Sequence, residues 1–341
     1  MSQPDSIARI LDANLDRARE GLRVLEDWCR FGLNQGELTA QFKHLRQRLA
    51  QWHTADLRAA RDTPGDPGTT LTHPQERLRS SVAQVLQANF CRVEEALRSL
   101  EEFGKIHHPE LSEACKQLRY QVYTLESQVM AHQRFQQLQQ AQLYLVTAPD
   151  PNLLPVVKAA LQGGLQMVQY REKVGDDCDR LPIAQQLRAL CQQYGALFFI
   201  NDRVDLALAV EADGVHLGQQ DLPIATARAL LGRQRLIGRS TTNPEEMAQA
   251  LAEGADYIGV GPVYATPTKP DKAAAGLDYV RYAAQNSPVP WFAIGGIDAA
   301  NLAEVMAAGG DRVAVVRAIM QADNPTAASR ALLTQLQAAP H

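Results

Sequence analysis

The 341-residue chain has few cysteines and no grouping of cysteine and histidine with zinc-ligand spacing. Its five cysteines are odd in number and widely spaced, and none forms a Cys-x-x-Cys pair. These features argue against a disulfide framework and against a structural zinc site. We therefore expect free thiols in a reducing compartment, and a cytoplasmic protein.

The chain also lacks a strong excess of either charge and any long apolar run. A formal net charge of -4 is too small to recruit nucleic acid or an anionic membrane by bulk electrostatics. The N-terminus has no basic and apolar signal pattern, and no run reaches the roughly 18 apolar residues of a membrane span. We expect neither nucleic acid nor membrane as a partner, and the sequence allows a homo-oligomer without fixing the oligomeric state.

A shift in hydrophobic pattern divides the chain. Helical spacing of apolar residues extends almost throughout residues 1 to about 140, and short β-branched runs alternate with helical stretches afterwards. We expect an all-α helical domain over residues 1–128 and an α/β domain over residues 129–341. The polar, helix-prone segment 133–142 is interpreted as the end of a helical connector.

The second domain contains eight short apolar runs, each followed by an amphipathic stretch. Eight β-α units in about 200 residues predict a closed (β/α)8 TIM barrel, with an open doubly wound sheet as the structural alternative. The expected strands cover residues 143–148, 165–172, 196–202, 214–218, 236–241, 257–262, 290–296 and 312–317.

Polar residues are concentrated where these strands end. In such a barrel the C-terminal strand ends meet around one mouth, where active sites lie. In strand order, the residues that we expect to meet there are Gln169, Arg171, Lys173, Asn201, Asp202, Asp221, Ser240, Thr266, Thr268, Lys269, Gly295, Gly296, Val316 and Arg317.

Two carboxylates, Asp202 and Asp221, suit Mg2+, which takes one or two protein carboxylates and completes its shell with water and phosphate oxygens. Arg171, Lys173 and Lys269 are expected beside them. Cations next to an acidic pair favour a metal-bound diphosphate between them.

A second anion site is expected at the A-I-G-G-I turn after the seventh strand and the V-V-R turn after the eighth. Phosphate-binding barrels hold a phosphate at this place through backbone N–H groups, and glycine lets the anion approach the backbone. Two phosphorylated ligands in one mouth indicate a joining or transfer reaction.

Six motifs occur in order on this expected barrel: Q-Y-R-E-K, I-N-D-R-V-D-L-A, G-V-H-L-G-Q-Q-D-L-P, G-R-S-T, T-P-T-K and A-I-G-G-I. Together they resemble the thiamine phosphate synthase family over roughly residues 140 to 335. The resemblance implies condensation of hydroxymethylpyrimidine diphosphate with thiazole phosphate, with release of diphosphate and without a nucleophile from the protein.

The resemblance also implies roles for individual residues. Mg2+ would be held by Asp202 and Asp221. A serine is common in the family where this chain has Arg317. The pyrimidine diphosphate would contact Gln169, Tyr170, Arg171, Glu172, Lys173, Asn201, Ser240 and Lys269, and the thiazole phosphate would contact Thr266, Pro267, Thr268, Gly296, Val316 and Arg317.

Each feature has a structural alternative. Asp202 and Asp221 would also suit helix N-caps, Ser240 a loop hydroxyl, and the paired glycines a plain turn. His216, on an apolar strand, is interpreted as a satisfied core residue rather than a ligand. The rival function is a sugar-phosphate isomerase or aldolase, but an aldolase needs a desolvated lysine on a strand.

The first domain contains an internal repeat. D-A-N-L-D-R-A-R-E-G-L-R-V-L-E-D (12–27) returns as Q-A-N-F-C-R-V-E-E-A-L-R-S-L-E-E (87–102), which indicates a duplication. Each copy carries one apolar stripe, typical of two bundle helices that share a packing face. The stripes are Leu15, Ala18, Leu22 and Leu25 in the first copy and Phe90, Val93, Leu97 and Leu100 in the second.

The repeated domain resembles the helical domain fused to some thiamine phosphate synthases, for which hydroxymethylpyrimidine phosphate kinase activity has been suggested. No G-x-x-x-x-G-K-[ST] phosphate loop is present. A non-catalytic dimerisation or regulatory module is the competing interpretation.

Overall fold

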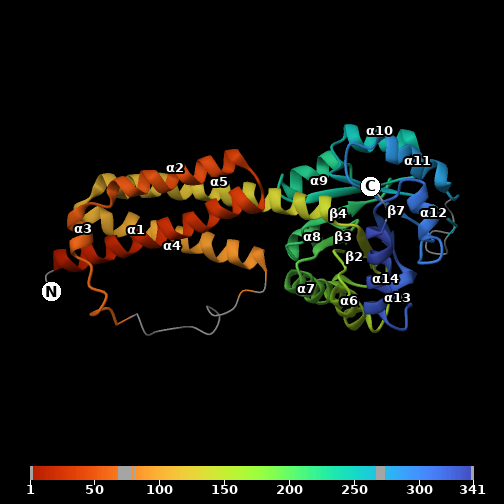
Figure 1. Cartoon of the computed structure of the whole chain (residues 1–341), viewed down its shortest axis with the longest axis horizontal. Coiled ribbons are helices and arrows are strands. Elements are labelled where there is room, and N and C mark those ends of the chain that lie inside the picture. The colour runs from red at the N-terminus through yellow and green to blue at the C-terminus, as the bar shows by residue number, and fades with distance from the viewer. Residues whose placement is uncertain (1–2, 68–78, 80, 266–272, 339–341) are drawn as a thin grey trace. The chain divides into compact units, whose positions relative to one another are not determined.

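The computed structural model describes residues 3–67, 79, 81–265 and 273–338. The chain divides into two compact units, Met1–Gln133 and Arg134–His341. The first contains only helices among its described residues, and the second is an eight-stranded barrel surrounded by helices (Figure 1).

In the first unit, four long helices lie alongside one another (Figure 1). Both apolar stripes of the repeat are fully buried in the core of this unit, so the predicted packing face is confirmed. A Cβ on Gly21 would lie 2.6 Å from Val93 Cγ2, and the missing side chain therefore lets α1 and α4 approach closely. The elements are α1 (Gln3–Asp27), the π-helical turn η1 (Trp28–Gly32), α2 (Gly36–Trp52), α3 (Ala55–Ala59), α4 (Val82–His107) and α5 (Pro109–Gln140).

The duplication extends beyond the helices in which the sequence reveals it. Arg46 Nε of α2 donates to Glu26 Oε2 of α1 at 2.9 Å, and Arg119 Nη2 of α5 donates to Glu101 Oε2 of α4 at 2.9 Å. Glu26 and Glu101 occupy the same position of the two repeats, and both are buried. The buried residues Leu38, Phe42, Leu45 and Leu49 of α2 have the same spacing as Leu111, Cys115, Leu118 and Val122 of α5.

The barrel is closed by eight parallel strands that follow one another in chain order. The predicted (β/α)8 barrel is confirmed, and the doubly wound alternative is wrong. All observed strands except β5 end one or two residues earlier than expected, and β5 has the expected bounds. Their bounds are β1 (Leu143–Val146), β2 (Met167–Tyr170), β3 (Leu197–Asn201), β4 (Gly214–Leu217), β5 (Leu236–Thr241), β6 (Tyr257–Val260), β7 (Trp291–Ile294) and β8 (Val313–Val315).

Helices pack around these strands and bury the outward-facing side chains (Figure 1). They are α6 (Leu153–Gln162), α7 (Asp177–Tyr194), α8 (Val204–Ala209), α9 (Ile224–Leu231), α10 (Pro244–Ala252), α11 (Gly276–Asn286), α12 (Leu302–Ala307), α13 (Arg317–Met320) and α14 (Pro325–Gln337). Among the described residues, no helix combines the length and the apolar character that crossing a bilayer requires.

The barrel interior is filled by large side chains from alternate strand positions. Tyr144, Phe199, Tyr257 and Phe292 form this inner core, with ring centroids 5.3 to 6.2 Å apart. A Cβ on Gly238 would lie 2.1 Å from the Tyr257 ring, so only glycine leaves room for that ring. Aromatic pairs with tilted or edge contacts stabilise such interiors beyond their burial.

The last turns of α5 belong to the barrel unit, as the sequence predicted for a helical connector. Leu138 of α5 and Ala141 just after it are buried in the inner core. Arg134 Nε donates to Asp213 Oδ1 at 2.9 Å, and Asp213 Oδ2 accepts from the backbone N–H of Phe198 at 3.0 Å. The helix is therefore anchored to the start of β3 by a buried carboxylate.

Glu94 of α4 provides a test of the electrostatics in the helical unit. Burial, reinforced by the carboxylates of Glu126 and Glu95, raises the pKa of Glu94 to about 7 from its ordinary value of 4.5. The folded state then binds more protons than the unfolded state between these values, so stability is lost as the pH rises through 7. We expect Glu94→Gln to raise the melting temperature at pH 8 and to leave it unchanged at pH 4.5.

Thermal unfolding at both pH values checks this expectation. The control is Glu20→Gln, because Glu20 is an exposed residue on α1. It should follow the wild-type pH profile. An equal melting temperature for wild type and Glu94→Gln at pH 8 would contradict the expectation.

Candidate active site

A cavity of about 450 Å³ opens at the C-terminal ends of the barrel strands. The cavity is lined by most of the residues that the sequence predicted to meet there, and they come from six strands or the loops after them. These are Gln169, Arg171, Lys173, Asn201, Asp202, Asp221, Ser240, Gly295, Gly296, Val316 and Arg317.

Tyr170 and Glu172 are the described exceptions. Side chains alternate along an extended segment, so Gln169, Arg171 and Lys173 face the cavity while the two residues between them do not. Tyr170 is buried in the outer core, between strands and helices. The predicted contacts of Thr266, Pro267, Thr268 and Lys269 lie outside the described residues.

Two carboxylates and an ammonium group meet at one side of the cavity. Lys173 Nζ lies 3.2 Å from Asp202 Oδ2, and Asp202 and Asp221 are close enough to shift each other's pKa. Asp221 Oδ2 also accepts from the backbone N–H of Gly218 at 2.7 Å. Asp202 has φ +61, a left-handed conformation that is uncommon outside glycine and that directs its carboxylate here.

The pKa values of these two carboxyl groups shift in opposite directions. Burial acts to raise the pKa of Asp202, but the hydrogen bond to Asp221 and the Lys173 charge lower it overall. Burial and the hydrogen bond to Asp202 raise the pKa of Asp221. The two carboxyl groups therefore influence each other's ionisation, as expected for close carboxylates.

Neither aspartate caps a helix, so that alternative is wrong. The N-cap residue of α8 is Arg203 and that of α9 is Pro223, and neither helix has a side-chain cap. Arg203 forms ion pairs with Asp177 and Asp205 and does not line the cavity.

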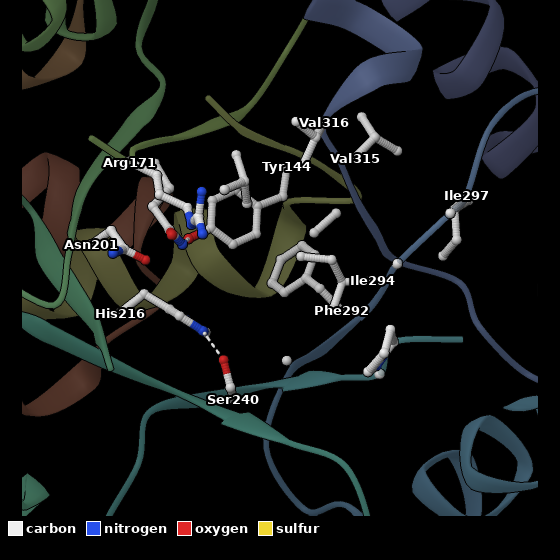
Figure 2. Close-up of a pocket in the computed structure, with 18 of the residues that line it drawn as sticks. Tyr144, Arg171, Asn201, His216, Ser240, Phe292, Ile294, Ile297, Val315 and Val316 are labelled. Atoms are coloured by element: carbon white, nitrogen blue, oxygen red, sulfur yellow. Dashed lines mark hydrogen bonds between the residues drawn. The ribbon is translucent and has the colours of Figure 1, made fainter. Parts of the chain in front are cut away.

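Arginines face the cavity on both sides. Arg171 and Arg317 make no ion pair or side-chain hydrogen bond with the part of the chain that the structure describes. Figure 2 shows Arg171 on the same side of the cavity as Asn201. An anion in the cavity would therefore meet unpaired guanidinium groups.

A chain of buried hydrogen bonds forms the floor of the cavity. Ser240 Oγ bonds His216 Nε2 at 2.9 Å (Figure 2). His216 Nδ1 bonds the Tyr257 hydroxyl at 3.0 Å. The Tyr257 hydroxyl also lies 3.0 Å from that of Tyr144, which accepts from Gln169 Nε2 at 2.5 Å. This chain fixes the amide of Gln169 and the hydroxyl of Ser240, two predicted contacts, from below.

The interpretation of His216 as a satisfied core residue is confirmed, although the side chain also borders the cavity. Sequence reasoning missed Tyr144 and Phe292 as lining residues. The available signal was their inward position on strands whose neighbouring residues face the helices.

On the opposite side, the turn after β7 exposes its backbone. Gly295 has φ +107, and a Cβ there would lie 2.5 Å from Pro262. Gly296 follows with φ +70. Glycine is required at this turn by conformation and by space, which leaves peptide groups accessible from the cavity.

Comparison with known proteins decides the family. Residues 143–319 match the family described as thiamine monophosphate synthase. The chain belongs to that family. A thiamine-phosphate synthase of Nostoc sp. is 68% identical over 330 residues, which cover 97% of this chain and 94% of the relative. The Synechocystis sp. enzyme of the same name is 67% identical over 335 residues and 98% of each chain.

Among solved structures, thiamine phosphate pyrophosphorylase from Pyrococcus furiosus is similar with a TM-score of 0.54 and 37% identity. The similarity covers 60% of this chain and 97% of that one. The helical part is matched separately, since residues 9–128 match the ThiD2 family.

Removal of the Tyr257 hydroxyl tests the floor of the cavity. Tyr257→Phe leaves His216 Nδ1 and the Tyr144 hydroxyl without a shared partner. We expect it to lower the free energy of unfolding by about 1–3 kcal/mol, because buried polar groups lose their hydrogen bonds. Urea unfolding followed by circular dichroism measures the change.

The matched control is Tyr282→Phe at a partly exposed position of α11. A surface change of this kind is expected to stay within about 0.5 kcal/mol of wild type. Equal stabilities of the two variants would show that the chain of hydrogen bonds does not hold the floor.

Proposed function

We propose that the barrel, residues 129–341, condenses hydroxymethylpyrimidine diphosphate with thiazole phosphate to give thiamine phosphate and diphosphate. Family membership and the names of the relatives support this activity. The observation that carries it is the presence, in one cavity, of a pair of carboxylates with Lys173 on one side and an open glycine turn on the other.

Asp202 and Asp221 fit Mg2+. Two neighbouring carboxylates offer oxygen ligands for a divalent cation, and such a cation binds their deprotonated forms. When bound, Mg2+ neutralises negative charge on diphosphate oxygens. Lys173 and Arg171 would bind the same diphosphate by charge-assisted hydrogen bonds.

Bond breaking requires the leaving diphosphate to be stabilised. Its departure from the pyrimidine methylene leaves a cation that the electron-rich ring delocalises, so no protein nucleophile is needed. Lys173 and Arg171 stabilise charge as it develops on the leaving group, most strongly where water is excluded. Gln169 and Ser240, held from below, would orient the pyrimidine ring.

The second substrate is positioned from the other side. The Gly295–Gly296 turn and Arg317 would bind the thiazole phosphate through backbone N–H groups and a guanidinium group. This anchor directs the thiazole nitrogen toward the pyrimidine methylene, and such positioning accelerates bond formation.

A Schiff-base aldolase is disfavoured by Lys173. Among the described residues it is the one lysine that lines the cavity, and its side chain is 55% exposed and paired with Asp202. An amine in that environment is not desolvated.

Asp202→Asn tests the role of the carboxylate pair. Asparagine keeps the size and tolerates positive φ, so the fold is retained while one charge is lost. We expect kcat/KM for diphosphate release to fall by about 100-fold or more, with both substrates required in the wild type.

The control is Asp179→Ala, which alters an exposed group of possible cation ligands formed by Asp176, Cys178 and Asp179. It should retain wild-type release. Wild-type rates for Asp202→Asn, or no release by the folded wild-type chain, would contradict the proposal.

For residues 1–128, we propose phosphorylation of hydroxymethylpyrimidine phosphate to the diphosphate that the barrel would consume. The match of residues 9–128 to the ThiD2 family supports this second activity. We expect the full chain to form ADP from ATP only when the pyrimidine phosphate is present, and Asp202→Asn to keep this reaction. A folded chain that forms no ADP would favour the non-catalytic module instead.

A further inference from the structure

The helical unit has a charged cavity of its own, about 530 Å³ in volume, between α1 and the segment that follows α3. Arginines and aspartates line it, among them Arg9, Asp12, Asp16, Arg17, Arg61 and Asp62. The barrel reaction uses none of these residues.

Asp12 organises one wall of this cavity. Its side chain is 3% exposed, and it accepts from Arg61 Nε at 2.7 Å and from Arg61 Nη2 at 2.9 Å. His53 Nε2 lies 2.6 Å from Asp12 Oδ1. Burial opposes ionisation, but these hydrogen bonds lower the pKa of Asp12, so the carboxylate stays charged and holds Arg61.

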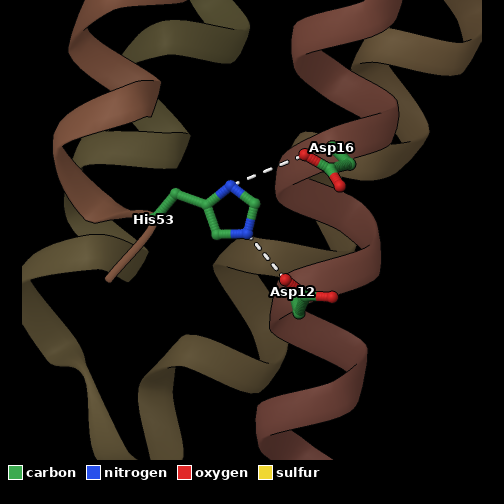
Figure 3. A group of neighbouring side chains, drawn as sticks. All are labelled: Asp12, Asp16 and His53. Atoms are coloured by element: carbon green, nitrogen blue, oxygen red, sulfur yellow. Dashed lines mark hydrogen bonds and ion pairs between the residues drawn. The ribbon is translucent and has the colours of Figure 1, made fainter. Parts of the chain in front are cut away.

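Asp12, Asp16 and His53 lie close enough together to suggest a metal site (Figure 3). Arginines occupy the ligand atoms, however. Arg61 Nη2 contacts both carboxylates. Arg19 Nη1 lies 3.2 Å from His53 Nδ1, and since an arginine only donates, that nitrogen accepts. A cation would have to displace two positive charges, so the geometry disfavours a metal.

Donors remain open toward the cavity instead. The Nη1 group of Arg61 makes no hydrogen bond with the described residues, and Arg17 makes neither a hydrogen bond nor an ion pair with them. The nearby Asp62 is engaged, since it accepts from Gly65 N at 2.9 Å and lies 3.7 Å from Arg9 Nη1. The groups that lack partners are therefore positive.

The duplication provides an internal comparison. In the second copy Gln87, Cys91 and Glu126 occupy the positions of Asp12, Asp16 and His53. Arg92, the counterpart of Arg17, donates to Asn89 Oδ1 at 2.7 Å. Asn14 and Asn89 each donate a hydrogen bond to the carbonyl four residues earlier, at 2.8 Å. Among the described residues, however, Arg17 does not form the bond to Asn14 that Arg92 forms to Asn89. Helix packing therefore does not require the guanidinium group of Arg17 to be without a hydrogen-bond partner among the described residues.

We propose that this cavity binds a phosphate group through Arg17 and Arg61, with Asp12 and His53 as positioning residues that fix Arg61. Guanidinium groups bind phosphate oxygens by paired, charge-assisted hydrogen bonds. The phosphate can belong to a pyrimidine phosphate or to a nucleotide. The inference rests on the second activity proposed above. Binding is tested without turnover, so that the phosphate site and the kinase activity can fail separately.

The test is hydrogen–deuterium exchange of the full chain with inorganic phosphate, hydroxymethylpyrimidine phosphate or ATP, in EDTA to prevent turnover. Peptides that cover residues 5–20 and 55–67 should be protected, and barrel peptides report the other site separately. The tightest probe identifies the source of the phosphate. Arg17→Gln should raise the probe concentration needed for half-maximal protection about tenfold or more, because a charged hydrogen bond is lost.

Arg92→Gln is the matched control and should bind as the wild type does. Arg61→Lys keeps a charge beside buried Asp12, removes the Nη1 donors and should also weaken binding. Protection of neither segment by any probe overturns the proposal, and so does wild-type affinity in Arg17→Gln. Binding without ADP formation would support the phosphate site and contradict the proposed kinase activity.

Discussion

Closure of eight parallel strands is the constraint on which the barrel site depends. Because all strands point the same way, their C-terminal ends meet, and Lys173, Asp202 and Arg317 face one cavity although they are far apart in sequence. The Lys173 charge then acts on Asp202. Burial and the neighbouring Asp202 raise the pKa of Asp221, whereas Asp221 and Lys173 lower the pKa of Asp202 against the effect of burial.

The same closure explains what could be predicted from sequence. Eight apolar runs defined the strands, and polar residues just beyond them defined most of the mouth. The prediction included Tyr170 and Glu172 because it took Q-Y-R-E-K as a block, whereas the period of two in an extended chain turns every second side chain away. The floor of Tyr144, Tyr257 and His216 depends on contacts across the barrel, which no local pattern records.

In the helical unit, the sequence predicted the packing better than the charges. The repeated stripes of α1 and α4 were visible because packing imposes a period. The contacts of Asp12 with His53 and Arg61 join residues 41 and 49 positions apart. The second copy retains the Glu–Arg pair that packs each helical hairpin but not this cluster, so the two hairpins share a scaffold and differ where α1 borders a cavity.

The close contact between Gly238 and Tyr257 has a consequence for redesign of the barrel. The ring of Tyr257 occupies the space that any side chain at position 238 would need, and its hydroxyl connects His216 to Tyr144. A side chain at position 238 therefore requires a smaller residue at position 257. An engineer who wishes to reshape the cavity floor for a different heterocycle must begin at a position that has no side chain.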